Sequence, residues 1–318
     1  MKKGIVALFI FSLILGFVSC NKDDDNGDDF VEEEIRDRGE QQIIDNDSIV
    51  GYLETHYYNS GDFSGNANPS IADLVITELL EGETVPVGNT MLDVAVDVDN
   101  PRTVTFANTV YQYYVLNLNP NADGDSPSFA DEVRVRYEGF ELNGDVFDSA
   151  VTPVDFDLVS LVPGWRKVLP EFNTSSSFVI EDDGVVSYTN HGVGVMFLPS
   201  GLGYFSNRTG GIPSYSPLVF KFDLLQMTVN DHDNDGVPSY LEDLNGDGEF
   251  TIADFEDDTI THDDTDGNSI PDYFDPDDDG DGVLTIDEDI DGDGDPTNDI
   301  GANGIPKYLD DTETATKE

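Results

Sequence analysis

The sequence predicts an α+β protein in which an antiparallel sheet wraps on a short helix and a tail of calcium-type loops follows. Three observations lead to this prediction. Residues 133–137 alternate strictly between apolar and polar side chains, the pattern of a half-buried antiparallel strand. The segment WRKVLPEF, after Gly164, forms a helix that Pro170 limits to about two turns. From residue 231 onward, Asp-x-Asp-x-Asp/Asn motifs recur with little apolar sequence between them.

Length and charge restrict the possible function classes. The chain has 318 residues, with 67 Asp and Glu against 14 Lys and Arg, and a net charge of −53. This length suits about two or three domains rather than one. Nucleic acid is excluded as a partner, because phosphate binding needs clustered cations. The single cysteine excludes an intramolecular disulfide scaffold and a thiolate zinc cluster.

Residues 1–19 are predicted to be a lipoprotein signal peptide. Two lysines precede an apolar run that ends just before Cys20 and is too short to span a bilayer comfortably. The sequence FVSC resembles the lipobox of bacterial lipoproteins, although Phe17 stands where the lipobox prefers Leu. This resemblance implies that Cys20 is lipidated and anchors the chain to a membrane. The alternative is an ordinary signal peptide that contains a cysteine.

Residues 20–47 are predicted to be an acidic tether. Its first part, NKDDD, resembles the export signal of surface-exposed outer-membrane lipoproteins, and a purely solvated spacer is the alternative. We therefore expect an outer-membrane lipoprotein that is exposed at the cell surface. A lipoprotein that faces the periplasm is the second possibility.

Residues 48–129 are predicted to be an N-terminal extension that packs onto the next domain. Ser48 is placed to cap a helix with Ile49 and Leu53 on its apolar face. The segment YQYYVLNL, residues 111–118, is rich in β-branched and aromatic residues and predicts a strand. Nothing in this region indicates chemistry.

Residues 130–228 are predicted to be the α+β domain. Asn143 and Gly144 form a strong hairpin signal between the first alternating strand and the next. After the short helix, strands return at residues 193–198 and 217–225. These pieces predict an antiparallel sheet around one helix.

Six short blocks in this domain resemble, in their order, the FKBP family of peptidyl-prolyl cis–trans isomerases. The blocks are VRYEG, FDS, LVPGW, PSGLGY, GIP and PLVFKFDLL. The resemblance implies an apolar pocket for a proline ring, with Trp165 as its floor, and Asp148 and the Tyr204 hydroxyl as the polar groups that meet the peptide. The implied walls are Tyr137, Phe147, Leu161, Val162, Ile212 and Phe220. The alternative is that these aromatic residues form the core of another sheet domain.

The resemblance implies catalysis without a cofactor on proline-containing polypeptide clients. Rotation about an Xaa–Pro bond faces a barrier of ~18–20 kcal/mol that amide resonance sets. A dry pocket favours the twisted amide, whose carbonyl carries less charge. Three departures put rate and substrate preference in question: Val154 replaces an aromatic residue of the family, Phe205 replaces a glycine, and an insertion within residues 173–192 is expected to form a hairpin near the site.

The tail, residues 229–318, is predicted to bind structural calcium. A calcium loop needs oxygen ligands at positions 1, 3 and 5, glycine at position 6 and a carboxylate at position 12. Loops at residues 231–242, 243–254, 264–275 and 277–288 follow this pattern, although Ser269 replaces the glycine of the third. The candidate ligands are Asp231, Asp233, Asp235, Glu242, Asp243, Asn245, Asp247, Asp254, Asp264, Asp266, Asn268, Asp275, Asp277, Asp279, Asp281 and Glu288.

The spacing of the tail resembles thrombospondin type 3-like repeats, which wrap calcium ions and have almost no hydrophobic core. A disordered acidic tail is the alternative. Three functions follow from the whole sequence. The first is an anchored isomerase that assists proline-limited folding at the bacterial envelope. The others are a proline-peptide-binding module without turnover and a calcium-dependent surface or adhesion protein in which the isomerase fold is only a scaffold.

Overall fold

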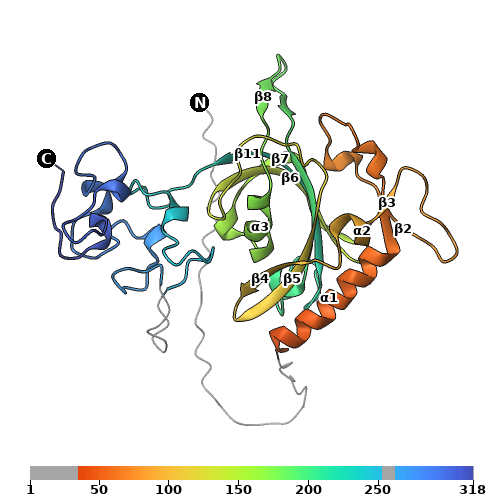
Figure 1. The fold of residues 1–318 in the computed structure, drawn as a ribbon, viewed down its shortest axis with the longest axis horizontal. Coiled ribbons are helices and arrows are strands. Elements are labelled where there is room, and N and C mark those ends of the chain that lie inside the picture. Colours follow the sequence, from red (N-terminus) through yellow and green to blue (C-terminus); the bar gives the residue numbers. More distant parts are fainter. Residues whose placement is uncertain (1–34, 253–261, 318) are drawn as a thin grey trace, which may run out of the picture. The chain divides into compact units, whose positions relative to one another are not determined.

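The computed structural model describes residues 35–252 and 262–317 (Figure 1). The predicted signal peptide, Cys20 and Asp254 lie outside the described residues. The described residues from Arg36 onward belong to one compact unit. Within the described ranges, no helix combines the length and the apolar character that crossing a membrane requires.

The N-terminal helix is longer than the sequence predicts. Helix α1 (Arg38–Thr55) begins after Asp37, whose Oδ1 accepts a hydrogen bond from the Glu40 amide at 2.9 Å. The prediction of a helix start at Ser48 is wrong, and residues 38–47 belong to α1 rather than to a tether. Asp is as good an N-cap as Ser, and the first half of the helix buries polar side chains that the apolar pattern cannot reveal. Ile49, by contrast, is fully buried as expected.

A small antiparallel sheet and a second helix follow α1. This sheet has the strand order β2-β1-β3. Its strands and the helix are β1 (His56–Tyr58), β2 (Ile76–Glu78), β3 (Thr90–Met91) and α2 (Leu92–Val96).

The main sheet has six strands within the described residues, in the order β4-β5-β10-β11-β6-β7, and every neighbouring pair is antiparallel. The α+β prediction therefore agrees with the structure. The hairpin expected at Asn143 and Gly144 connects β6 to β7, and Gly144 has a φ of 87°. The strands are β4 (Arg102–Phe106), β5 (Thr109–Asn117), β6 (Glu132–Glu141), β7 (Val146–Asp157), β10 (Gly192–Leu198) and β11 (Leu218–Thr228).

The main sheet reaches beyond the boundary placed at residue 130. Strands β4 and β5 come from residues assigned to the extension, and β5 pairs with β10, with Val115 opposite Met196. The strand pattern at residues 111–118 indicates a strand but not its partner, so the sequence could not assign it to this sheet.

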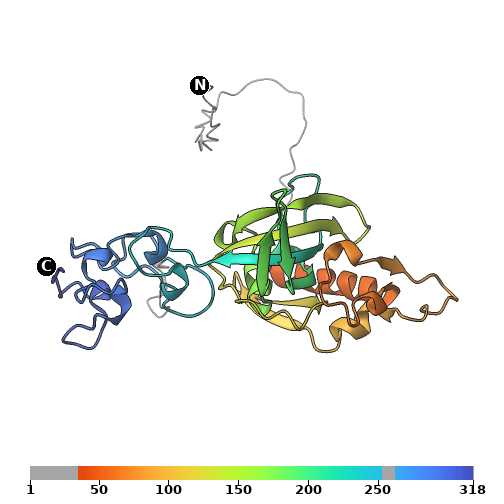
Figure 2. The ribbon, with the colours of Figure 1, turned by 90° about the horizontal axis from the view of Figure 1, so that it is seen from above.

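The central strands of the sheet are buried on both faces, and β10 shows this most clearly. Met196 and Leu198 belong to a core that includes Trp165 of α3 (Pro163–Val168), whereas Val195 and Phe197 belong to a second core with residues of α1. Accordingly, Figure 1 shows α3 within the curve of the sheet and α1 along its other side, and the orange α1 also lies next to the strands in Figure 2. Helix α1 is thus part of the same folded unit as the pocket described below.

The inserted residues form a hairpin, β8 (Ser177–Ile180) with β9 (Val186–Thr189), which projects from the sheet in Figure 1. The described residues that line the pocket do not include any of this hairpin. The insertion therefore forms the expected hairpin, but this hairpin does not line the pocket.

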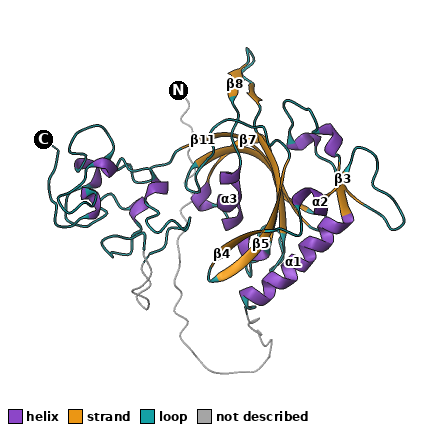
Figure 3. Ribbon diagram, viewed as in Figure 1, coloured by secondary structure: helices purple, strands orange, loops and turns teal. Residues whose placement is uncertain are grey.

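The tail folds as loops joined by short 3₁₀ turns (Figure 3). Few apolar side chains are buried in it, among them Val237 and Tyr308. Many carboxyl groups are buried instead, including those of Glu242, Asp278 and Glu288. A tail whose interior consists of carboxyl groups needs compensating positive charge or protons.

Candidate functional site

All nine residues predicted for the pocket line one cavity of about 350 Å³. The cavity opens on the side of the sheet that holds α3. Its lining also includes three residues that the sequence analysis did not select, Phe156, Thr209 and Gly210. Strands β6, β7 and β11, the start of α3 and the loop between β10 and β11 thus each contribute a part of the wall.

Trp165 lines the cavity and is 3% exposed. It lies at the start of α3, where Pro163 fits the first turn because that turn needs no amide donor. A side chain at Gly164 would place its Cβ 2.2 Å from a Leu198 methyl carbon, so glycine is needed for α3 to approach the sheet this closely. The indole meets the rings of Tyr137 and Phe220 edge-on, at centroid distances of 5.7 and 5.2 Å.

Phe156 adds an aromatic ring to the cavity that the sequence analysis did not select. Its ring lies 5.3 Å from that of Tyr137 and 5.9 Å from that of Trp165. Val154 packs against the same core as a partly buried residue. The alternation of β7 places residues 154 and 156 on one face, so this signal could have identified Phe156.

Two tyrosines, Thr209 and one carboxyl group supply the polar side chains of the pocket. The Tyr137 hydroxyl donates a hydrogen bond of 2.5 Å to Asp148 Oδ2, and the Ser149 amide donates to Asp148 Oδ1 at 2.8 Å. Burial, and then the hydrogen bond to Asp148, raise the pKa of Tyr137. Burial and the charge of Asp148 raise the pKa of Tyr204 as well. Both phenols are therefore donors at neutral pH.

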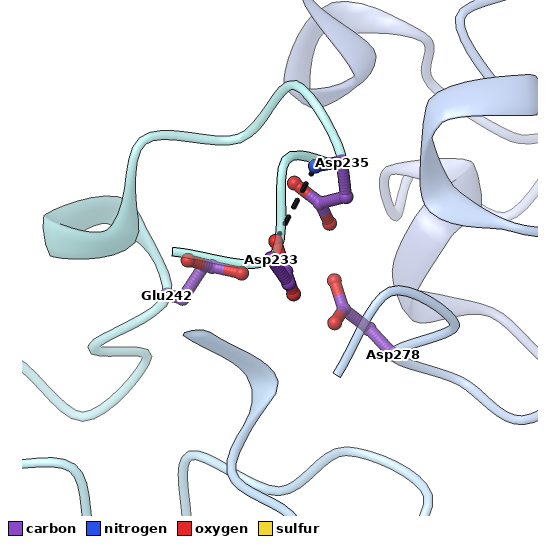
Figure 4. Close-up of side chains that lie close together, drawn as sticks. All are labelled: Asp233, Asp235, Glu242 and Asp278. Carbon is purple, nitrogen blue, oxygen red and sulfur yellow. Dashed lines mark hydrogen bonds between the residues drawn. The ribbon is translucent and has the colours of Figure 1, made fainter. Parts of the chain in front are cut away.

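A second candidate site lies in the tail. Carboxyl oxygens of Asp233, Asp235, Glu242 and Asp278 lie within 4.8 Å of one another, and Figure 4 shows these side chains converging. Three of them come from the first predicted loop, as expected. Asp278 comes from the fourth loop, and the sequence analysis missed it because position 2 of a loop is not a ligand position in the calcium pattern.

This cluster has unpaired buried oxygens. Both carboxyl oxygens of Glu242 and of Asp278 have no hydrogen-bond partner, and these residues are 0% and 1% exposed. Burial, and then the neighbouring carboxylates, raise the pKa of Glu242 to about 10 and that of Asp278 to about 11. Buried carboxylates of this kind fit a hard cation, because oxygen atoms are the ligands that calcium takes.

The fourth loop forms another cluster, made by Asp277, Asp279 and Asp281. Glu288 is 1% exposed, and the nearby charges of these residues contribute to raising its pKa to about 8, after burial itself. A third cluster, Asp289 with Asp291 and Asp293, follows the same spacing but lacks a carboxylate at position 12 and was not predicted.

The remaining predicted ligands are arranged differently. Asp231 and Asp243 accept hydrogen bonds from backbone amides of their own loops, as turn-forming carboxylates do. In the third loop, the Asn268 amide group donates to Asp266 and Asp275, at 3.0 and 2.6 Å. Three further candidates are also outside the carboxylate clusters found among the described residues: Asn245, Asp247 and Asp264.

Part of the chain is similar to curated isomerases. The FKBP-type 22 kDa peptidyl-prolyl cis-trans isomerase of Escherichia coli is 29% identical over 119 residues, which are 36% of this chain and 49% of that protein. The peptidyl-prolyl cis-trans isomerase Mip of Coxiella burnetii is 35% identical over 97 residues, 30% of this chain and 40% of Mip. The outer membrane protein MIP of Legionella longbeachae is 28% identical over 120 residues, 36% of this chain and 43% of that protein.

These matches agree with the composition of the pocket. Part of this chain is homologous to FKBP-type peptidyl-prolyl isomerases. The chain spans less than half the length of each of these FKBP-type relatives. Residues 232–298, in the tail, match a family model described as BamM C-terminal, which the sequence analysis did not predict.

Proposed function

We propose that this protein is a peptidyl-prolyl cis–trans isomerase of the FKBP type that acts on proline-containing polypeptides. The observation that carries the proposal is the cavity, in which the nine residues expected from the family lie together around Trp165. The homology to named isomerases supports the same reaction.

Catalysis follows from the polarity of this pocket. The planar amide of an Xaa–Pro bond is stabilised by resonance, which places partial charge on the carbonyl oxygen and makes it depend on hydration. The aromatic walls replace water around the bond. The planar amide therefore loses more hydration free energy on entering the pocket than the twisted amide does, and the barrier to rotation falls. The rings of Trp165, Phe156 and Phe220 supply the apolar surface, and the Tyr204 phenol can hold the neighbouring carbonyl of the peptide.

The test is an isomerisation assay on a short Xaa–Pro peptide with purified protein. The wild type is compared with a Tyr204→Phe, Asp148→Val double variant, whose fold is checked by circular dichroism. A wild-type rate above the uncatalysed rate, lost in the folded variant, supports the proposal. If the folded wild type binds the peptide without accelerating isomerisation, the pocket is a docking site and the enzyme proposal is wrong.

We further propose that the protein is a lipoprotein of the outer membrane, exposed at the cell surface. The lipobox-like sequence before Cys20 supports the anchor, and the relative named outer membrane protein MIP is consistent with an envelope location. Cys20→Ala should move the protein from the membrane fraction to the soluble fraction. Protease treatment of intact cells separates surface exposure from a periplasmic orientation, and an unchanged membrane fraction contradicts the anchor.

Calcium binding by the tail is the second function that we propose. Glu242 and Asp278, buried and without partners, favour it over a tail that needs no cation. The ion would be held by Asp233, Asp235, Glu242 and Asp278, and a second one by Asp277, Asp279, Asp281 and Glu288. Bound calcium would neutralise these carboxylates, so its binding energy would become folding energy of the tail.

This proposal is tested on the full chain by circular dichroism and hydrodynamic radius. Chelator, magnesium and calcium at about millimolar concentration, the range of extracellular calcium modules, are compared. Compaction in calcium alone supports the proposal. Identical spectra and radii in chelator and calcium contradict it.

A further inference from the structure

One face of α1 reaches the loop that carries Tyr204. Gln41 and Asp45 lie on this face, and both are buried, at 2% and 1% exposed. Asp45 Oδ2 accepts hydrogen bonds from the Ser200 amide at 2.7 Å and from the Ser200 hydroxyl at 2.6 Å. Asp45 Oδ1 accepts from Gln41 Nε2 at 2.6 Å. Asp45 therefore binds a residue that is 155 positions further along the chain.

Ser200 begins the turn that leads to Tyr204. It is fully buried and opens the 3₁₀ turn Ser200–Leu202. Its carbonyl accepts hydrogen bonds from the amides of Gly203, at 2.9 Å, and of Phe205, at 2.8 Å. The backbone on both sides of Tyr204 is thus bonded to the residue that Asp45 holds.

Phe205, directly after Tyr204, has a φ of 50°. Bulky residues rarely adopt this left-handed conformation, so the surrounding structure must hold it. Arg38 of α1 supplies part of this support: its guanidinium lies 4.2 Å from the centre of the Phe205 ring, and it donates to the Tyr111 hydroxyl at 3.0 Å. The Phe205 carbonyl also accepts from the Tyr215 amide at 2.6 Å.

Stability alone does not account for a carboxyl group at this position. Ile49 and Leu53, further along the same helix, fill the corresponding buried positions with apolar side chains. Burial raises the pKa of Asp45, so a carboxylate at this position costs free energy in the folded protein. An apolar residue at such a site often stabilises a fold as well or better.

We propose that α1 is part of the isomerase site and that Asp45 is a positioning residue, which holds the Tyr204 phenol in the pocket through Ser200. The inference rests on the proposed isomerase function and deepens it. It also gives residues 38–55, for which the sequence indicated no chemistry, a role in the reaction.

Four full-length variants test this inference. Asp45→Asn places an amide nitrogen, which is a donor, against either the donors of Ser200 or the donor Gln41 Nε2. The Gln41 amide cannot flip to offer its oxygen instead without losing the hydrogen bond from Arg36 Nη1. In the double variant Asp45→Asn, Gln41→Glu, the new amide nitrogen at position 45 can donate to the new carboxylate at position 41. The amide oxygen at position 45 then remains to accept the hydrogen bonds from Ser200. Ser200→Ala removes one of the two bonds to Asp45 and is the milder change. Leu53→Ala is the control, since it destabilises α1 without touching Ser200.

Two measurements are made on each variant: kcat/KM for an Xaa–Pro peptide, at a temperature where all are folded, and amide hydrogen exchange of residues 199–215. Asp45→Asn should lower kcat/KM about tenfold, as expected for a lost hydrogen bond to a charged group, and should speed exchange in this segment. The Gln41→Glu combination should recover both, and Ser200→Ala should show a smaller loss. Leu53→Ala should lower the melting temperature. Its kcat/KM should be unchanged, and so should the exchange rate of residues 199–215 relative to the rest of the chain.

The outcomes separate this inference from the proposed function. If the wild type has no isomerase activity, the proposed function fails, while the exchange data still decide whether Asp45 orders the loop. The inference is overturned if Asp45→Asn changes neither measurement, if Gln41→Glu recovers nothing, or if Leu53→Ala produces the same loss of activity.

Discussion

The Tyr137 hydroxyl donates a 2.5 Å hydrogen bond to Asp148, across the adjacent strands β6 and β7. This bond joins a wall residue of the pocket to its only carboxyl group among the described lining residues. It fixes the orientation of Asp148 before a peptide arrives, so the peptide does not have to order this side chain.

Removing this bond should lower activity more than stability. We expect Tyr137→Phe to reduce kcat/KM about tenfold, because a hydrogen bond to a charged group contributes about 1.5–3 kcal/mol. The ring contacts with Trp165 and Phe156 remain, so the fold should persist. The assay uses a short Xaa–Pro peptide, with Tyr188→Phe as the matched control because its hydroxyl bonds to Gln226 outside the pocket. Equal activity in both variants would contradict the role of the Tyr137–Asp148 bond.

Two glycine-to-alanine substitutions should change the free energy of unfolding in opposite directions. A Cβ at Gly139 would lie 2.6 Å from the Phe147 ring and 2.8 Å from the Phe220 ring, so Gly139→Ala must displace two walls of the pocket. We expect a stability loss of about 1–3 kcal/mol together with lower activity. Gly51 lies inside α1 with nothing within 4 Å of its Cβ position, and Gly51→Ala should stabilise by about 0.5–1 kcal/mol. Denaturant unfolding measures the free energy of unfolding of both variants. An unchanged value for Gly139→Ala would show that these rings are not tightly packed.

The activity should be constant between about pH 7 and pH 9, because an unperturbed tyrosine titrates at about 10 and both pocket phenols titrate higher. A raised tyrosine pKa favours the protonated phenol in the folded state. Its contribution to stability is therefore complete below about pH 10 and is lost only as the pH rises through the raised pKa. The measurement is kcat/KM against pH. An inflection within this range that Tyr204→Phe removes would mean that the Tyr204 phenol ionises during the assay.

Asp278→Asn should weaken calcium binding by at least about tenfold, because affinity in such sites depends on the number of charged ligands. Its carboxyl group lies in the cluster with Glu242 although it belongs to another loop. Asp287→Asn is the control, since that side chain is 49% exposed and lies 3.8 Å from the Lys317 ammonium group, outside the cluster. Isothermal titration with calcium measures both. Equal affinities in the two variants would remove Asp278 from the site.

The sequence by itself determined much of the pocket and part of the tail. The alternation at residues 133–137 and the Asn143-Gly144 turn predict β6 and its hairpin, because both signals act over a few residues. The nine pocket positions were implied by the resemblance of six short blocks to the FKBP family, and the structure brings them around one cavity. Asp233, Asp235 and Glu242 likewise belong to a single loop of twelve residues. In such a short loop the positions along the sequence already indicate which side chains come together.

Only the tertiary structure decided the relationships between distant segments. That β5 pairs with β10, that Asp45 holds Ser200, and that Asp278 joins the cluster of the first loop are contacts between residues far apart in the chain. A polar residue on a helix shows no periodic signal for its partner, because periodicity reports which face is buried and not what covers it. For this reason the sequence did not reveal that the extension supplies two strands of the sheet, or that Asp45, in the segment predicted as a tether, supports the loop of Tyr204.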